Sequence, residues 1–245
     1  MIEVLDLHKT LGTQEVLRGI NLKINKGHTH VILGRSGSGK SVLLKHLVGL
    51  FQPNAGKVLI DGENIAGLKE RQLGPIRKKV GILFQSGALF DSMNVGENIA
   101  FPLREAGIQD EALIRAKVAE ALEMVDLAGE EEKTPDNLSG GMRKRVGLAR
   151  TIVSRPACIL YDEPTTGLDP IATDSINHLI RRLQRRLQAT SIVVTHDMKT
   201  AFHTGDRIAF LHEGQIYFEG TVDELRASTD PLLVNFIEGR SGESD

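Results

Sequence analysis

Residues 34–41 have the types and spacing of a loop that binds phosphate, G-x-x-x-x-G-K-[ST]. Glycines let backbone N–H groups close around phosphate oxygens, because no Cβ stands in the way. Lys40 offers a positive charge to the β- and γ-phosphates of a nucleotide, and Ser41 offers a hydroxyl that can ligate Mg²⁺. A purely structural turn is disfavoured, because a strand-like apolar run precedes the loop and a helical pattern follows it. The predicted phosphate-binding residues are Gly34, Arg35, Ser36, Gly37, Ser38, Gly39, Lys40, Ser41 and Val42.

Two adjacent acids, Asp162 and Glu163, follow the apolar run 158–161. Carboxylates at the end of a buried strand are costly unless they serve a cation or a reaction. Asp162 is predicted to assist in holding Mg²⁺, and Glu163, whose side chain points elsewhere, is predicted to activate water as a general base. A pair of helix-capping acids is the alternative, which the nearby phosphate loop disfavours.

His196 follows another apolar run, 192–195. From the residues alone, two interpretations stand side by side. One is an ordinary turn histidine; the other is a ring that hydrogen-bonds the γ-phosphate at the carboxyl edge of the sheet.

The elements that must position these residues are strands and helices in alternation. Short apolar runs between helical patterns predict buried parallel strands, and the helix-rich stretch 88–156 predicts a helical lobe inserted into an α/β core. Thr221 and Glu224 have the spacing of a capping box that begins a C-terminal helix. Strands are expected at 31–33, 58–60, 80–83, 158–161, 192–194 and 208–211, and helices at 42–51, 110–127 and 171–188.

The composition is that of an ordinary globular protein of 245 residues, with 40% apolar and 25% charged residues. A formal net charge of -2 argues against nucleic acid as a partner. No apolar run approaches the roughly 20 residues that span a bilayer, so any membrane role is expected to depend on a partner. Four arginines share one helix face, which could meet lipid head groups but is better explained as a solvated face. They are Arg181, Arg182, Arg185 and Arg186.

One further motif resembles a known family. Residues 138–142, with the sequence LSGGM, resemble the LSGGQ signature of ATP-binding cassette (ABC) transporter ATPases. Gln85 resembles the Q-loop of that family, Asp169 its D-loop and His196 its switch histidine, and the resemblance covers essentially the whole chain. It implies an α/β fold of the P-loop NTPase ABC ATPase type. That fold has a RecA-like core, an antiparallel β subdomain and an inserted helical subdomain.

The resemblance also implies how the chain is divided and which residues do the chemistry. A single ABC ATPase domain over 1–245 would comprise the core and β subdomain (1–87 and 157–222), the helical subdomain (88–156) and a C-terminal helical segment and tail (223–245). The cofactors would be ATP and Mg²⁺. The implied catalytic residues are Glu163, His196 and Gln85, and the implied Mg²⁺ ligands are Ser41, Gln85 and Asp162.

The signature residues Ser139, Gly140 and Gly141, together with Asp169, are implied to bind nucleotide held by a second copy of the chain. Ser139 is of the N-cap type, and two glycines expose N–H groups at a helix start. A single chain carries one phosphate loop and one signature, so a head-to-tail homodimer with two shared ATP sites is implied. The family often has an aromatic residue near position 11 that stacks on adenine, and here it is Leu11.

A narrower resemblance points to the ATPases of Mla and Mce phospholipid transporters. It rests on residues 83–90, 93–95, 101–105, 230–231 and 236–239, and on Met142 in the signature. It implies a subunit that hydrolyses ATP to power phospholipid transport between membranes, in the maintenance of outer-membrane lipid asymmetry. The implied partners are an integral-membrane permease, an Mce-type lipid-binding protein and a small regulatory subunit, with the chain peripheral at the cytoplasmic face of the inner membrane.

Two alternatives stay open. One is an ABC ATPase that serves an importer of a different solute, and the other is a soluble ABC scaffold of the iron–sulfur assembly type, which has no permease. Joint exposure of Ala88, Leu89, Phe90 and Met93 would favour a permease partner, because an exposed apolar patch marks a docking surface.

Overall fold

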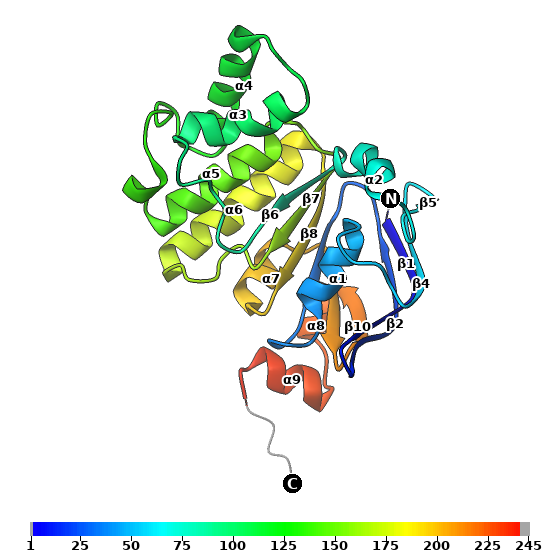
Figure 1. The fold of residues 1–245 in the computed structure, drawn as a ribbon. Coiled ribbons are helices and arrows are strands. Elements are labelled where there is room, and N and C mark those ends of the chain that lie inside the picture. Colours follow the sequence, from blue (N-terminus) through cyan, green and yellow to red (C-terminus); the bar gives the residue numbers. More distant parts are fainter. Residues whose placement is uncertain (1, 241–245) are drawn as a thin grey trace.

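The computed structural model describes residues 2–240, which form two β-sheets with helices packed around them (Figure 1). The larger sheet has the strand order β10-β9-β3-β8-β7-β6, and only the edge strand β10 is antiparallel to its neighbour. Five of the six predicted strand runs lie in this sheet. Because β3, β8 and β7 are parallel neighbours, the residues that follow them meet at one edge. The strands are β3 (Thr29–Leu33), β6 (Val80–Leu83), β7 (Cys158–Asp162), β8 (Thr190–Thr195), β9 (Arg207–His212) and β10 (Gln215–Thr221).

The smaller sheet is antiparallel, as the family resemblance implies, with the strand order β2-β1-β4-β5. Sequence patterns indicate only the strand at 58–60, because register shifts in β1 break the alternation of apolar and polar residues. The left-handed backbone of Asp6, with φ of 46°, lies at one such shift. The strands are β1 (Ile2–Leu11), β2 (Gln14–Ile24), β4 (Ala55–Ile60) and β5 (Glu63–Asn64).

The predicted helices at 110–127 and 171–188 correspond to α4 and α6, and the predicted capping box of Thr221 and Glu224 begins α8. The helix expected at 42–51 is wrong at both ends, since α1 begins at Lys40 and ends at Leu47. It ends early because Gly49 adopts φ of 67°, which no right-handed helix allows. The helices are α1 (Lys40–Leu47), α2 (Glu70–Arg77), α3 (Val95–Glu105), α4 (Glu111–Met124), the 3₁₀ turn η1 (Pro135–Asn137), α5 (Gly140–Ile152), α6 (Pro170–Leu187), α7 (Met198–Thr204), α8 (Val222–Arg226) and α9 (Pro231–Ile237).

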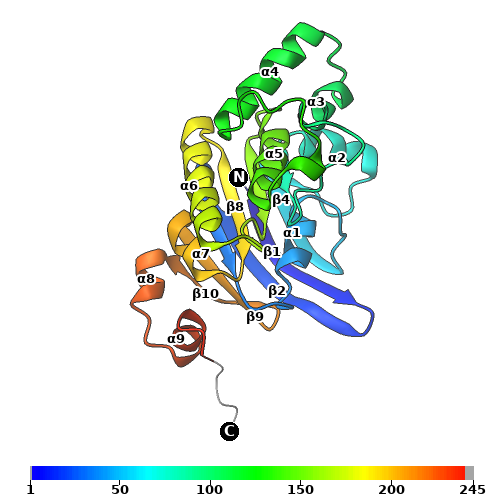
Figure 2. The ribbon, with the colours of Figure 1, turned by 90° about the vertical axis from the view of Figure 1, so that its left-hand side faces the viewer.

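The larger sheet is buried on both faces, which explains why its strands are continuous apolar runs. Alternate residues of one strand belong to two separate cores: Ile159 and Tyr161 to one, Cys158 and Leu160 to the other. Figures 1 and 2 show α5, α6 and α7 on one side of the sheet and the antiparallel strands on the other. The sheet therefore forms a rigid support, and the residues that follow its strands are held in fixed positions.

Residues 88–156 contain α3, α4 and α5 and, in the structure, no strand. Figure 1 shows α3 and α4 at the end of the molecule opposite α9. Asn94 begins α3 with a capping box to Glu97. The division of the chain into subdomains stays a prediction, and part of the predicted tail, 241–245, lies outside the described residues. Among residues 2–240, no helix combines the length and apolar character needed to cross a bilayer.

Candidate nucleotide site

The phosphate loop, residues 34–39, joins β3 to the start of α1. Gly37 and Gly39 have φ of 80° and 104°, a backbone that residues with a Cβ rarely adopt. A Cβ at Gly34 would lie 2.4 Å from the carbonyl oxygen of Leu211, so this position also requires glycine. The buried hydroxyl of Ser38 has no hydrogen-bond partner among the described residues. The loop is thus a cradle of backbone groups at a helix N-terminus, which suits an anion.

Lys40 folds back over this loop. Its ammonium donates hydrogen bonds to the carbonyls of Gly34 at 2.9 Å and Arg35 at 3.0 Å, and its Nζ lies 3.6 Å from Glu163 Oε1. The side chain is 6% exposed, and burial lowers the pKa of Lys40 while the Glu163 carboxylate opposes that effect. A buried cation held by carbonyls can turn to a phosphate when one binds.

Glu163 is the centre of a network of polar side chains that only the folded chain brings together. It is 12% exposed, its Oε2 lies 2.9 Å from His196 Nδ1, and the hydroxyls of Thr195 and Thr166 donate to the same oxygen at 3.4 Å. Its backbone has φ of 48°, and its N–H donates to the carbonyl of Val194. The strained turn directs the side chain of Glu163 away from Asp162, although the two are neighbours in sequence.

Ser41 and Asp162 form a second contact across the same sheet edge. The Ser41 hydroxyl donates to Asp162 Oδ1 at 3.3 Å, and burial is the largest influence on the Asp162 carboxyl, raising its pKa. A hydroxyl and a carboxylate are oxygen ligands of the kind that Mg²⁺ prefers, so the residues present fit that ion. Gln85, an exposed side chain after β6, lies at the mouth of the same cleft.

These groups line a cleft of about 290 Å³. Nine predicted residues line it, together with two that the sequence did not identify, Val16 from β2 and Thr166 after β7. Four further predicted residues do not line the cleft but contact Lys40, Ser41 or one another: Gly34, Arg35, Ser38 and Asp162. The nine are Ser36, Gly37, Gly39, Lys40, Ser41, Val42, Gln85, Glu163 and His196.

Lys144 is a further candidate that sequence reasoning missed. It lies on α5, 5% exposed, and its ammonium donates to the backbone carbonyl of Gln85 and, at 3.5 Å, to that of Glu163. Burial lowers the pKa of Lys144. The sequence carried no signal for this role, because Lys144 stands between Arg143 and Arg145 and looks like one of three exposed cations. This lysine ties the segments that carry Gln85 and Glu163 to one helix.

The signature segment lies apart from this cleft. Ser139 is the exposed N-cap of α5, and its hydroxyl accepts the N–H of Met142 at 3.2 Å. Asp169 is the N-cap of α6, accepting from the N–H groups of Ile171 and Ala172. A Cβ at Gly140 would be 3.5 Å from Leu168, so the two helix starts are neighbours. Ser139, Gly140, Gly141 and Asp169 do not line the cleft that holds Lys40.

Comparison with known proteins agrees with this geometry. The family model described as ABC transporter matches residues 17–166. The probable ribonucleotide transport ATP-binding protein Mkl of Mycobacterium leprae is 43% identical over 98% of this chain and 69% of its own length. The intermembrane phospholipid transport system ATP-binding protein MlaF of Haemophilus influenzae is 42% identical over 98% of this chain and 91% of its own length.

Other transporters are similar too. The methionine import ATP-binding protein MetN of Rhizobium etli is 40% identical over 98% of this chain and 66% of its own length. A solved structure, the dimeric post-hydrolysis state of the ATP-binding cassette MJ0796 bound to ADP and Pi, superposes with a TM-score of 0.82. It is 33% identical and covers 91% of this chain and 99% of its own. The chain therefore belongs to the ABC transporter family, as an ATP-binding and ATP-hydrolysing transporter subunit.

Proposed function

We propose that this subunit powers the transport of phospholipid between membranes. One observation carries the proposal: the segment that follows Gln85 has the Mla and Mce pattern and presents apolar side chains at the surface. The similarity to MlaF, over 91% of that protein's length, supports it. Sequence identity over the whole chain does not distinguish a phospholipid cargo from an amino-acid cargo, because the methionine import protein MetN is nearly as similar to this chain as MlaF is.

In the proposed reaction, Glu163 accepts a proton from the water that attacks the γ-phosphate, which removes the need to form free hydroxide. His196 fixes the Glu163 carboxylate through the 2.9 Å contact and can turn its other ring nitrogen to the γ-phosphate. Lys40 leaves its loop carbonyls to pair with the β- and γ-phosphates. Ser41 and Asp162 would hold Mg²⁺ with the side chain of Gln85. When bound, that ion would neutralise charge on the phosphates.

The site is proposed to be completed by a second copy of the chain. The signature helix start is exposed and does not line the cleft of its own chain, and a helix N-terminus favours an anion. The dimeric state of the solved MJ0796 cassette supports this arrangement. Asp169, at the neighbouring helix start, would lie at the junction between the two copies.

The permease is proposed to dock on residues 84–93. Ala88 and Phe90 are exposed and Leu89 and Met93 are half-buried, so the predicted patch exists in part. The loop is rigid, because the buried amide of Asn98 bonds the N–H and carbonyl of Phe90 and the carbonyl of Met93. A rigid apolar surface loses little conformational entropy when a partner binds.

The remaining partners and the location belong to the same proposal. An Mce-type lipid-binding protein and a small regulatory subunit would complete the complex. The chain would be peripheral at the cytoplasmic face of the inner membrane and held there by the permease. Residues 88–156, as the helical subdomain, would carry the signature toward the second copy.

The test is purification of the tagged chain from membranes of its own host, with identification of the proteins and lipids that co-purify. Phe90→Asp should abolish recovery of the permease, because it places a charge in the patch. Leu113→Asp is the matched control: Leu113 is 44% exposed against 41% for Phe90, and an acid suits its place in the first turn of α4. A permease recovered with an amino-acid-binding protein and no phospholipid would contradict the proposed cargo.

A further inference from the structure

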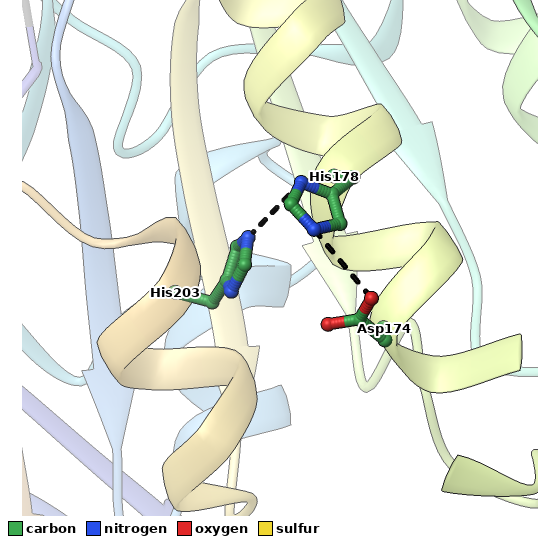
Figure 3. Close-up of side chains that lie close together, drawn as sticks. All are labelled: Asp174, His178 and His203. Carbon is green, nitrogen blue, oxygen red and sulfur yellow. Dashed lines mark hydrogen bonds and ion pairs between the residues drawn. The ribbon is translucent and has the colours of Figure 1, made fainter. Parts of the chain in front are cut away.

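A cluster of metal-ligating side chains lies outside the nucleotide cleft, on the outer side of α6 and α7. Asp174 and His178 are one turn apart on α6, and His203 lies in the last turn of α7 (Figure 3). One ligand atom from each of the three residues lies within 4.8 Å of the other two. Among residues 2–240, no other three histidine, cysteine or acidic side chains come this close.

We propose that Asp174, His178 and His203 bind a transition-metal ion of the Zn²⁺ class and thereby join α6 to α7. Imidazole nitrogens and a carboxylate form a usual ligand set for zinc, which has no strong geometric preference. With Zn–N distances of about 2.0–2.1 Å, a tetrahedral site needs its nitrogens about 3.3–3.4 Å apart. His203 Nε2 and His178 Nδ1 lie 3.3 Å apart.

An ion shared by all three residues requires the Asp174 carboxylate to move. Asp174 Oδ2 lies 3.5 Å from His178 Nε2, so His178 now contacts its neighbours through both ring nitrogens. An ion would use one of them. The side chains of Asp174 and His178 are 63% and 66% exposed, which leaves room for a rotamer change that brings all three ligands to one point.

A buried polar atom beside the cluster supports the assignment independently. Asn177 is 2% exposed, and its Oδ1 has no hydrogen-bond partner among the described residues. Asn177 lines a surface hollow together with Asp174 and His203. A zinc ion with three protein ligands keeps a water in its fourth position, and a movement of Asn177, whose oxygen is closed to solvent in this structure, would let that water donate to it.

The neighbouring arginines do not prevent a cation from binding. Arg181 pairs with Asp206 at 2.8 Å, and Arg182 pairs at 2.6 Å with Asp126, an acid that it shares with Arg145, so both guanidinium groups are directed to carboxylates. Arg185 and Arg186 lie about two helical turns beyond His178, roughly 10–12 Å along the axis. Both side chains are exposed to water, which weakens their repulsion of a cation.

Such an ion would connect two elements next to the nucleotide site. α6 begins directly after Asp169, and α7 begins two residues after His196. α7 is also tied to the loop after Glu163 by the hydrogen bond between Thr200 and Thr165 at 3.0 Å. A metal that binds only the folded arrangement stabilises it by mass action, so zinc should raise the thermal midpoint of the protein.

The experiment is a titration of the chelator-washed, nucleotide-free full chain with ZnCl₂, followed by calorimetry. We expect a site that binds zinc in a one-to-one ratio, and His178→Gln and His203→Gln should each weaken it at least about tenfold by removal of a ligand. Asp174→Asn, which keeps the shape and removes the charge, should weaken it as well. Zinc should raise the thermal midpoint of the parent chain but not that of His203→Gln.

His8→Gln is the matched control. His8 also lies between two acids, Asp6 and Glu15, but these three residues do not offer ligand atoms that all lie within 4.8 Å of one another. Equal zinc binding by the parent chain and His203→Gln would overturn the proposal, as would an equal loss in His8→Gln. X-ray absorption of the zinc-loaded parent chain supplies a measurement without mutation. Imidazole scattering at about 2.0–2.1 Å is expected, and its absence would contradict the assignment.

Discussion

Two regions each include a helix N-terminus: the phosphate-loop cluster (residues 34–41 with Asp162, Glu163 and His196) and the signature segment (residues 138–142 with Asp169). They differ in how their polar side chains are buried and hydrogen-bonded. In the cluster, Lys40 and Glu163 are buried and bonded to residues far away in the sequence. In the signature segment, Ser139 and Asp169 are exposed and bond only the first turns of their own helices. One region is organised within the chain, and the other faces outward.

This difference agrees with the proposal that a single chain makes only half of a site. Buried groups with several partners stay in place without substrate, so the cluster is preorganised for chemistry. An exposed helix start adds nothing to catalysis until an anion reaches it. The contrast predicts that substitutions in the cluster and in the signature fail in different ways, and the following changes test that contrast.

The largest effect is expected for Glu163→Gln. The amide keeps the size of the side chain but cannot accept a proton, so ATP turnover should fall by roughly 10²–10⁴-fold. Binding of ATP should be retained, and the protein should accumulate as an ATP-bound dimer. Phosphate release and mass measurements in solution check both points. Turnover near the level of the parent chain would show that Glu163 is not the base.

A smaller effect, on the affinity for ATP rather than on turnover, is expected for Lys40→Ala. This change removes the cation beside the phosphates, and a hydrogen bond to a charged group contributes about 1.5–3 kcal/mol. Affinity for ATP should therefore fall by roughly 10–100-fold, measured by direct titration rather than by turnover. Unchanged affinity would contradict the place given to Lys40 in the cluster.

The smallest of these effects is expected for Lys144→Met, which tests whether the cluster depends on its support from α5. Loss of the bonds to the carbonyls of Gln85 and Glu163 should reduce turnover by about tenfold and leave ATP affinity nearly unchanged. Lys144→Arg, which restores a donor, should recover part of the loss. A uniform fall in stability with no change in turnover per folded molecule would assign Lys144 to packing alone.

Local motifs predicted the parts of the site that lie next to one another in the sequence. The phosphate loop, the two acids at the end of β7 and the N-cap Ser139 could all be found from residue type and spacing. The contact between Ser41 and Asp162 could be expected only because parallel strands bring their carboxyl ends to one edge. The roles of Gln85 and Asp169 came from the family resemblance alone.

Long-range and irregular features escaped prediction for physical reasons. Lys144 bonds two backbone carbonyls, and a carbonyl leaves no mark in the sequence. The strands β1 and β2 were not predicted, because bulges in their pairing interrupt the alternation of apolar and polar residues. The cluster of His178 and His203 depends on how α6 packs on α7, which spacing within either helix does not reveal.

The central claim is that each ATP site combines the cluster of one chain with the signature of another, and mixed dimers test it directly. Two differently tagged copies allow Lys40→Ala and Ser139→Arg to be placed on different subunits or on the same subunit. Placed apart, both lesions fall in one shared site and the other site stays intact. Placed together, they damage both sites.

The measurement is the amount of ATP trapped per dimer, together with the residual turnover. Both are needed, because coupling between the two sites can make the turnover rates of the two kinds of dimer equal even when their ATP occupancy differs. The account predicts that dimers with the lesions on different subunits retain about half of the trapped ATP of the parent dimer. Dimers with both lesions on one subunit should trap almost none. Equal trapping by the two kinds of dimer would contradict the shared site.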